Sequence, residues 1–249
     1  MEVEQLAHLQ DLSITSAIVI NCEDCVFMSS LQKLSLVDSN LDTLHDDGII
    51  ACIALQSFTY HGTKIGTSDS DDESMYLPFE TNTFTRFPPD LSALTQLTDL
   101  SLIIDSITMG QFDVSWVYAL TRLQTLALNL TRGKVFIWLT HNLSALSNLL
   151  SLSLCLPAES TLVVTECVEW HSMQSLQRIE FHAEGLYISP NLLGLFDLKQ
   201  LRSVSFVSCR PSDEISVEVL KSFLEQYRVG KSVFRLHQTD WELQSLIGS

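Results

Sequence analysis

A leucine pattern repeats along most of this chain and limits what it can fold into. Its clearest copy runs from Leu94 to Ile107 and contains L-x-x-L-x-L-x-x-(polar)-x-L, with Asp105 at the polar position. Alternate side chains of an extended segment face the same way, so Leu100 and Leu102 are expected to point inward together. One such strand cannot bury its apolar face alone, whereas stacked copies bury a continuous core.

The pattern recurs with a nearly constant period. Counted from the first leucine of each core, copies begin at Leu9, Leu31, Leu55, Leu97, Leu123, Leu149, Leu176 and Leu201. The second and third core positions are apolar in every copy: Leu12/Ile14, Leu34/Leu36, Phe58/Tyr60, Leu100/Leu102, Leu126/Leu128, Leu152/Leu154, Ile179/Phe181 and Val204/Phe206. The last four steps are 26, 26, 27 and 25 residues long, within the period of roughly 20 to 29 residues that is typical of leucine-rich repeats.

On these residues the chain resembles the leucine-rich-repeat superfamily over nearly its whole length. The resemblance implies an α/β solenoid, with a curved parallel sheet on the concave side and helices and irregular turns on the convex side. A leucine-rich array of amphipathic helices is the alternative, because i, i+3 spacing also suits a helix. The fixed long period favours the solenoid.

The whole chain, 1–249, is expected to be one domain of eight or nine repeats. The step from Leu55 to Leu97 is 42 residues, and its excess includes the acidic stretch near 66–76, which we expect to be a mobile insertion. Residues 230–249 are expected to cap the C-terminal end, with a final strand at 233–236.

Helical spacing follows several of the predicted strands. Segments expected to be helical are 46–53, 113–120 with Trp116 and Leu120 four apart, 136–146 with Phe136, Leu139, Leu143 and Leu146, a helix starting at Ser189-Pro190, and one starting near Ser212.

The chain is strongly acidic. Its 30 acidic and 14 basic residues give a net charge of −16, which argues against nucleic acid and anionic lipid as ligands and favours a protein partner with a basic surface. Neither a basic, apolar leader nor an apolar run of about 20 residues is present. We therefore expect no membrane contact and an intracellular, cytoplasmic location.

The residues that could carry chemistry are sparse. The six cysteines form no paired flanking clusters, and Cys22-Glu23-Asp24-Cys25 lacks the second pair of a zinc site, so we expect reduced thiols, no metal and no cofactor. Cys155 and His182 should be neighbours about 5 Å apart on adjacent strands, but no orienting acid or oxyanion donor is evident. His61 and His182 should lie about 19 Å apart, too far to share a metal. The prediction is a protein that is not an enzyme.

Partner contacts are expected on the outward face of the sheet. Small residues form its central row: Ser13, Ser35, Thr59, Ser101, Ala127, Ser153, Glu180 and Ser205. The next row contains Thr15, Val37, His61, Ile103, Asn129, Cys155, His182 and Val207, and its aliphatic members make it the favoured contact row. A preceding row of Lys33, Ser57, Asp99, Thr125, Ser151, Arg178 and Ser203 would supply polar contacts. The predicted partner-binding residues are Val37, His61, Ile103, Asn129, His182, Val207, Lys33, Asp99, Arg178 and Glu180.

Two kinds of modification motif occur. Ser68 and Ser70 each have an acid three residues later, which is a phosphorylation pattern, although a tolerated surface insertion is the favoured interpretation. Asn129 and Asn142 start glycosylation triplets. A glycan on Asn129 would obstruct the proposed face and Leu143 is expected to be buried, so chance matches are favoured.

Three functions agree with this sequence. The first is an interaction scaffold, monomeric and intracellular, that binds another protein on the concave face. The second is the substrate-recognition part of an F-box-type ubiquitin-ligase adaptor, because the repeats near 26 residues and the stretch 201–209 are similar to the cysteine-containing subclass found in F-box proteins. The third is a fragment of a receptor ectodomain.

Overall fold

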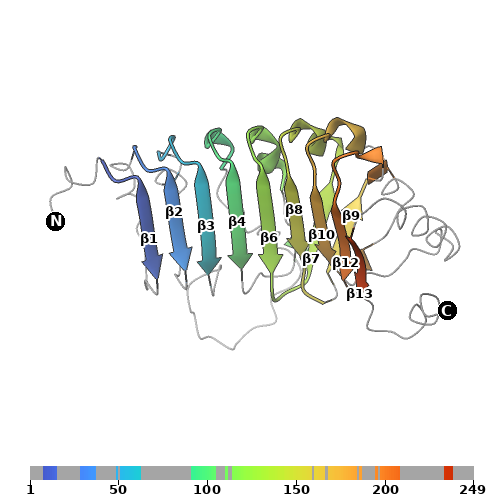
Figure 1. Cartoon of the computed structure of the whole chain (residues 1–249). Helices are drawn as coiled ribbons and strands as arrows, with labels where there is room; N and C mark the ends of the chain where they lie inside the picture. Colours follow the sequence, from blue (N-terminus) through green and yellow to red (C-terminus); the bar gives the residue numbers. More distant parts are fainter. Residues whose placement is uncertain are drawn as a thin grey trace, which may run out of the picture.

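The strands of the predicted repeats form one parallel sheet of nine strands, called the front sheet here (Figure 1). Each of its first eight strands begins two residues after the first leucine of its repeat. The strands, in spatial order, are β1 (Asp11–Thr15), β2 (Lys33–Val37), β3 (Ser57–Gly62), β4 (Asp99–Ile104), β6 (Thr125–Leu130), β8 (Ser151–Cys155), β10 (Arg178–His182), β12 (Ser203–Val207) and β13 (Val233–His237). The front sheet is the predicted concave side, and β13 confirms the predicted final strand.

This computed structural model describes part of the chain. The described residues are 8–15, 29–37, 49, 51–62, 91–104, 110–111, 114–158, 160–165, 168–183, 185–186, 194–195, 197–207 and 233–237. Several predicted features lie outside these residues: the acidic insertion, the starts of the helices expected from Ser189 and Ser212, half of the expected helix 46–53, most of the C-terminal cap, and Cys22 to Cys25.

Equivalent positions of successive repeats are aligned in the front sheet. Leu100 is aligned with Phe58 on one side and with Leu126 on the other. The alignment between β3 and β4 shows that the long step from 55 to 97 adds no strand to the front sheet. Backbone hydrogen bonds reinforce this register. The residue that follows the first leucine of a repeat accepts, at its carbonyl oxygen, hydrogen bonds from two N–H groups of the next repeat. The accepting residues are Gln10, Gln32, Gln56, Thr98, Gln124, Leu150 and Gln177.

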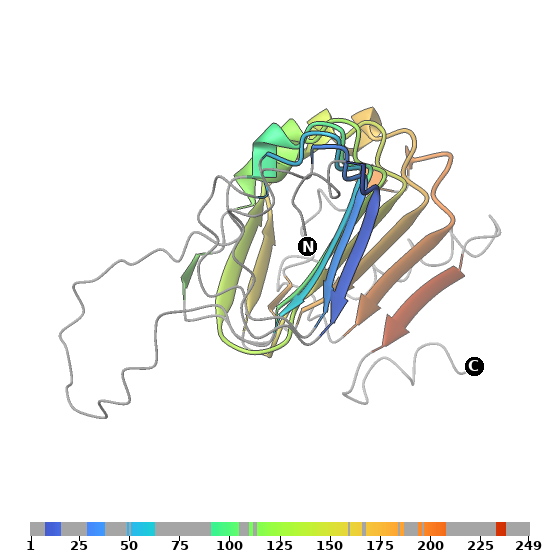
Figure 2. The same ribbon diagram turned by 90° about the vertical axis from the view of Figure 1, so that its left-hand side faces the viewer.

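A second parallel sheet, called the back sheet, lies opposite the front sheet (Figure 2). Its spatial order is β11 (Gly185–Leu186), β9 (Thr161–Val164), β7 (Val135–Leu139) and β5 (Gly110–Gln111). The prediction of a helix from Phe136 was therefore wrong. The stretch 135–139 reads V-F-I-W-L, and its alternating β-branched and aromatic residues suit a half-buried strand better than a helix.

The turns that lead into β4, β6, β8 and β10 contain 3-10 helices. They are η3 (Leu91–Ala93), η4 (Ser115–Ala119), η5 (His141–Ala145) and η6 (Trp170–Ser172). In η5 and the turn that follows it, Leu143, Leu146 and Leu149 are all buried, and the N–H of each later leucine donates to the carbonyl three residues earlier at 3.0 Å. Three residues complete one turn of a 3-10 helix, so a spacing of three keeps the same face inward.

The expected helix 113–120 is corrected in the same way. Among its described residues, Ser115–Ala119 form η4, and the buried side chains are Val114, Val117 and Leu120, at intervals of three. Trp116 is only partly buried, so the predicted pair of Trp116 and Leu120 does not define the inward stripe.

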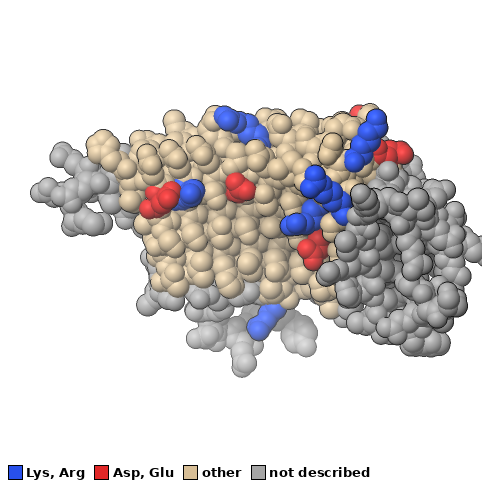
Figure 3. Space-filling model, in the orientation of Figure 1, with Lys and Arg blue, Asp and Glu red and all other residues tan. Residues whose placement is uncertain are grey.

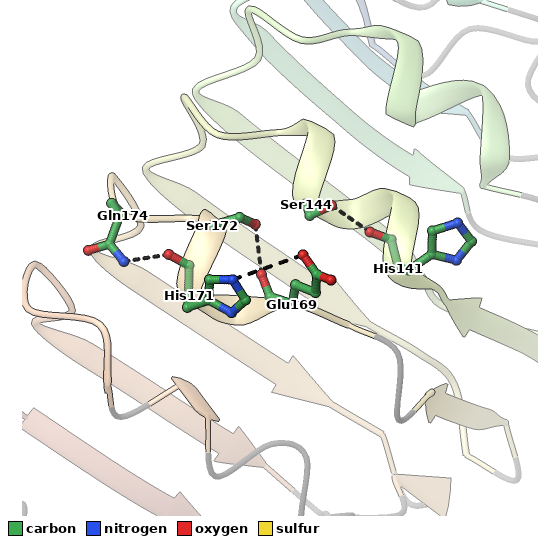
Figure 4. Close-up of polar contacts among 6 residues, drawn as sticks. All are labelled: His141, Ser144, Glu169, His171, Ser172 and Gln174. Atoms are coloured by element: carbon green, nitrogen blue, oxygen red, sulfur yellow. Dashed lines mark hydrogen bonds and ion pairs between the residues drawn. The ribbon is translucent and has the colours of Figure 1, made fainter.

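Hydrogen bonds from serine hydroxyl groups to backbone carbonyls three residues earlier stabilise these turns (Figure 4). Ser144 Oγ donates to the His141 carbonyl at 2.7 Å, and Ser172 Oγ donates to the Glu169 carbonyl at 2.7 Å. The turn carbonyls at the surface are thereby satisfied without an α-helix. Among the described residues, no helix is long and apolar enough to cross a membrane.

Tyr60 shares the core space of its repeat with a small neighbour, Gly62. Tyr60 is fully buried, and a Cβ atom added to Gly62 would lie 1.7 Å from the Tyr60 hydroxyl oxygen. In the next strand the same two inward positions hold Leu102 and Ile104. The Tyr60 ring therefore occupies volume that is divided between two side chains in β4, which is why a glycine follows it.

Candidate protein-binding face

The front sheet brings the predicted contact residues into continuous rows. Strand pairing aligns Val37 with His61, His61 with Ile103 and Ile103 with Asn129. On the far side of Cys155, His182 is aligned with Val207. The predicted rows are therefore present, but Val207 lies apart from the aliphatic pair on β2 and β4, so the three aliphatic residues do not form one patch.

The predicted contact residues fall into two groups by their exposure. Val37, His61, Ile103, Asn129, His182 and Val207 are half-buried, and Lys33, Asp99, Arg178 and Glu180 are exposed. Neighbouring strands lie about 4.8 Å apart, so the side chains of one row partly cover each other. This packing leaves the aliphatic residues less exposed to water than the sequence suggested.

The central row is small and almost uncharged over six strands. From β1 to β8 it consists of Ser13, Ser35, Thr59, Ser101, Ala127 and Ser153. Glu180 follows on β10, and the row continues through Ser205 to the position of Arg235 on β13. Short side chains allow the backbone or a helix of a partner to approach the sheet closely.

Cys155 and His182 form the contact that the sequence predicted. Their Sγ and Nδ1 atoms are 3.5 Å apart on the adjacent strands β8 and β10. Burial, and to a smaller extent the negative charge of Glu180, raises the pKa of the Cys155 thiol. The thiol is therefore held in its protonated form, which is the weaker nucleophile.

No metal centre is evident in the described part of the chain, where no group of three or more His, Cys, Asp or Glu side chains could hold an ion. The register also places four strand spacings, about 19 Å, between His61 and His182. The two cysteines in the described part, Cys52 and Cys155, are not joined in a disulfide.

Charge is distributed unevenly along the chain. The described residues include five acidic and eight basic residues, whereas the whole chain has 30 acidic and 14 basic ones. Most acidic residues therefore belong to segments outside the described part. The prediction of a basic partner rested on the whole-chain charge, and this distribution gives it no support at the front sheet.

The modification motifs are only partly placed. Ser68 and Ser70 lie outside the described residues, so their phosphorylation stays a prediction. Asn142 is exposed on η5, Leu143 is buried as expected, and Asn129 is half-buried in the second row of the front sheet.

Sequence reasoning missed an aromatic strip on the back sheet. Phe136 and Trp138 on β7 are 40% and 49% exposed, and they are aligned with Thr161 and Val163 of β9. The alternation in 135–139 is the signal that could have found them, because it places every second side chain outward.

Solved structures of leucine-rich-repeat proteins are similar to this chain. The internalin InlF of Listeria monocytogenes is 17% identical with a TM-score of 0.61, and the match covers 99% of this chain and 61% of that one. Internalin C2 of the same organism is 15% identical with a TM-score of 0.49, over 83% of this chain and 84% of that one. A leucine-rich-repeat protein of Leptospira interrogans is 19% identical with a TM-score of 0.43, over 93% of this chain and 62% of that one.

These findings establish the fold. The nine aligned strands and the likeness to InlF define a leucine-rich-repeat solenoid, which confirms the predicted resemblance and fold class. The chain spans about 61% of the length of InlF. No protein-family model and no curated protein sequence matches the chain.

Proposed function

We propose that this chain is a non-enzymatic interaction scaffold that binds a protein partner on the front sheet. The observation that carries the proposal is the alignment of nine strands, which presents a continuous strip of small, uncharged side chains from β1 to β8. The protonated Cys155 thiol adds support for a role without catalysis.

The size of this face restricts how a partner can bind. Nine strands at about 4.8 Å spacing are about 38 Å across, and five residues at about 3.3 Å rise are about 13 Å long. The product, about 500 Å², is below the roughly 800 Å² that each partner buries in a standard interface. A stable partner is therefore expected to engage most of the strands and not two or three.

The adaptor and receptor alternatives would use the same face, and no described feature favours either of them. A location inside the cell also remains a proposal, based on the sequence alone.

Aspartate substitutions on the front sheet test the proposal. Val37, Ile103 and Val207 are replaced together by Asp, and partners recovered by affinity purification are compared with those of the wild-type chain. The matched control replaces Phe136, Trp138 and Val163 of the back sheet by Asp. Circular dichroism and thermal unfolding of both variants verify that they fold.

We expect the front-sheet variant to lose partners that the control retains, because buried, unpaired carboxylates are costly at an interface. Equal recovery by the front-sheet variant and the wild-type chain would reject the proposal, and loss confined to the control would move the interface to the back sheet.

A further inference from the structure

The charged residues of the front sheet differ in whether they have a local partner. Lys33 Nζ lies 3.8 Å from Asp11 Oδ2, and Thr98 Oγ1 donates to Asp99 Oδ2 at 2.8 Å. Arg178 and Arg202, in contrast, are exposed, and their side chains make no hydrogen bond or ion pair with any described residue. Two guanidinium groups at one end of the face are thus free to bind something else.

The register places these two arginines close together. Arg178 is aligned with Ser203, the first residue of the adjacent strand β12, and Arg202 directly precedes Ser203 in the chain. The N–H of Arg202 donates to the Gln177 carbonyl at 2.8 Å, which fixes the backbone at this point. In Figure 3, basic side chains gather over the β10 and β12 end of the front sheet, while most of its remaining surface is uncharged.

We propose that this arginine end of the front sheet, Arg178 and Arg202, binds an acidic segment of the protein partner. The inference rests on the proposed function and specifies the chemistry of the partner at one end of the face. Guanidinium groups bind carboxylates through two parallel hydrogen bonds, which gives orientation as well as attraction. The partner is thereby aligned along the strip of small side chains, with its acidic segment over β10 and β12.

Two observations favour carboxylates over polyanions. The outward rows of β1 to β12 contain no Phe, Tyr or Trp on which nucleic-acid bases could stack. Glu180 lies on the same strand and face as Arg178, two residues away, and its negative charge reduces the net charge of the two arginines to about +1, which a single carboxylate neutralises.

Peptide probes test the inference on the full chain. A fluorescent peptide of alternating Glu and Ser is titrated with the protein, and binding is followed by fluorescence anisotropy. Peptides with Gln, Lys or phosphoserine in place of Glu, and a single-stranded oligonucleotide, are compared at about 0.05 M and about 0.5 M salt. The test variant is Arg178→Gln with Arg202→Gln, and the control is Arg122→Gln with Arg132→Gln, which removes the same charge elsewhere.

The Glu peptide is expected to bind more tightly than the Gln and Lys peptides at low salt. Its affinity should fall roughly tenfold in the test variant and stay unchanged in the control. Both variants lose two positive charges and have the same net charge, so a difference between them reports the position of the arginines. Equal binding of Glu and Gln peptides, equal loss in the control, or preference for the phosphopeptide or oligonucleotide would overturn the inference. If the aspartate variant of the front sheet loses partners but the peptide test fails, the binding of an acidic segment by Arg178 and Arg202 is refuted. The proposal that partners bind on the front sheet then still holds.

Discussion

Tyr60 is buried in a space that two side chains fill elsewhere in the same sheet. Its hydroxyl group reaches the position that a Cβ atom of residue 62 would need, so shape complementarity at this repeat depends on a pair of residues. Phe181 in β10 and Ala183, directly after this strand, are both fully buried and likewise combine a large and a small residue two positions apart.

Substitution of Gly62 by Ile should destabilise the protein by about 1–3 kcal/mol, because it overpacks a filled core. Combining it with Tyr60→Leu reproduces the Leu102/Ile104 pair of β4 and should recover most of the loss. Urea unfolding of the two single variants and the double variant measures this coupling. Additive effects of the two changes would show that the residues do not share this space.

Cys155 is expected to react slowly with alkylating reagents. Burial and Glu180 disfavour the thiolate, so the alkylation rate should reach its midpoint above the ordinary thiol pKa of about 8.5. Replacing Glu180 with Gln removes the smaller of the two causes and should shift this midpoint to lower pH. Peptide mass spectrometry after iodoacetamide treatment measures alkylation of Cys155 separately from the other cysteines. A pH midpoint at or below the ordinary thiol pKa would contradict the expected effect of burial and Glu180.

The 3-10 turns set which leucines of each repeat face the core. Leu149 follows Leu146 by three residues and is fully buried, whereas the adjacent Leu150 is only partly buried. Two neighbouring residues of the same type therefore occupy different environments, which allows a matched test of the inward direction.

Leu149→Ala should cost about 2–5 kcal/mol of stability, the range for buried leucine truncations. Leu150→Ala should cost clearly less, about 1 kcal/mol, because its side chain is already partly in water. Urea denaturation at equal protein concentration gives both values. Equal losses would mean that the two side chains are buried to the same extent.

The sequence predicted the front strands well because their constraint is local and repeated. The pair Leu100 and Leu102 must face inward together, and the period of the repeats places equivalent residues side by side. The back strand 135–139 was missed because 136–146 also contains apolar residues at helical intervals, which masked the alternation within V-F-I-W-L. The Cys155–His182 contact could be predicted from register, whereas the free Arg178 and Arg202 side chains required knowledge of their surroundings.

Each repeat of this molecule mainly contacts the repeat before it and the repeat after it, so stability is approximately a sum over single repeats and the interfaces between neighbours. The long step between Leu55 and Leu97 leaves the pairing of β3 and β4 intact. The described repeats contain a minority of the acidic residues of the chain, so net charge is a poor guide to the chemistry of the front sheet.

Site-specific photocrosslinking tests most directly whether partners bind on the front sheet. A benzophenone amino acid is placed at Ala127, in the central front row, or at Phe136, exposed on the back sheet. The account predicts partner adducts from Ala127 and only background from Phe136. Adducts from Phe136 with none from Ala127 would contradict it.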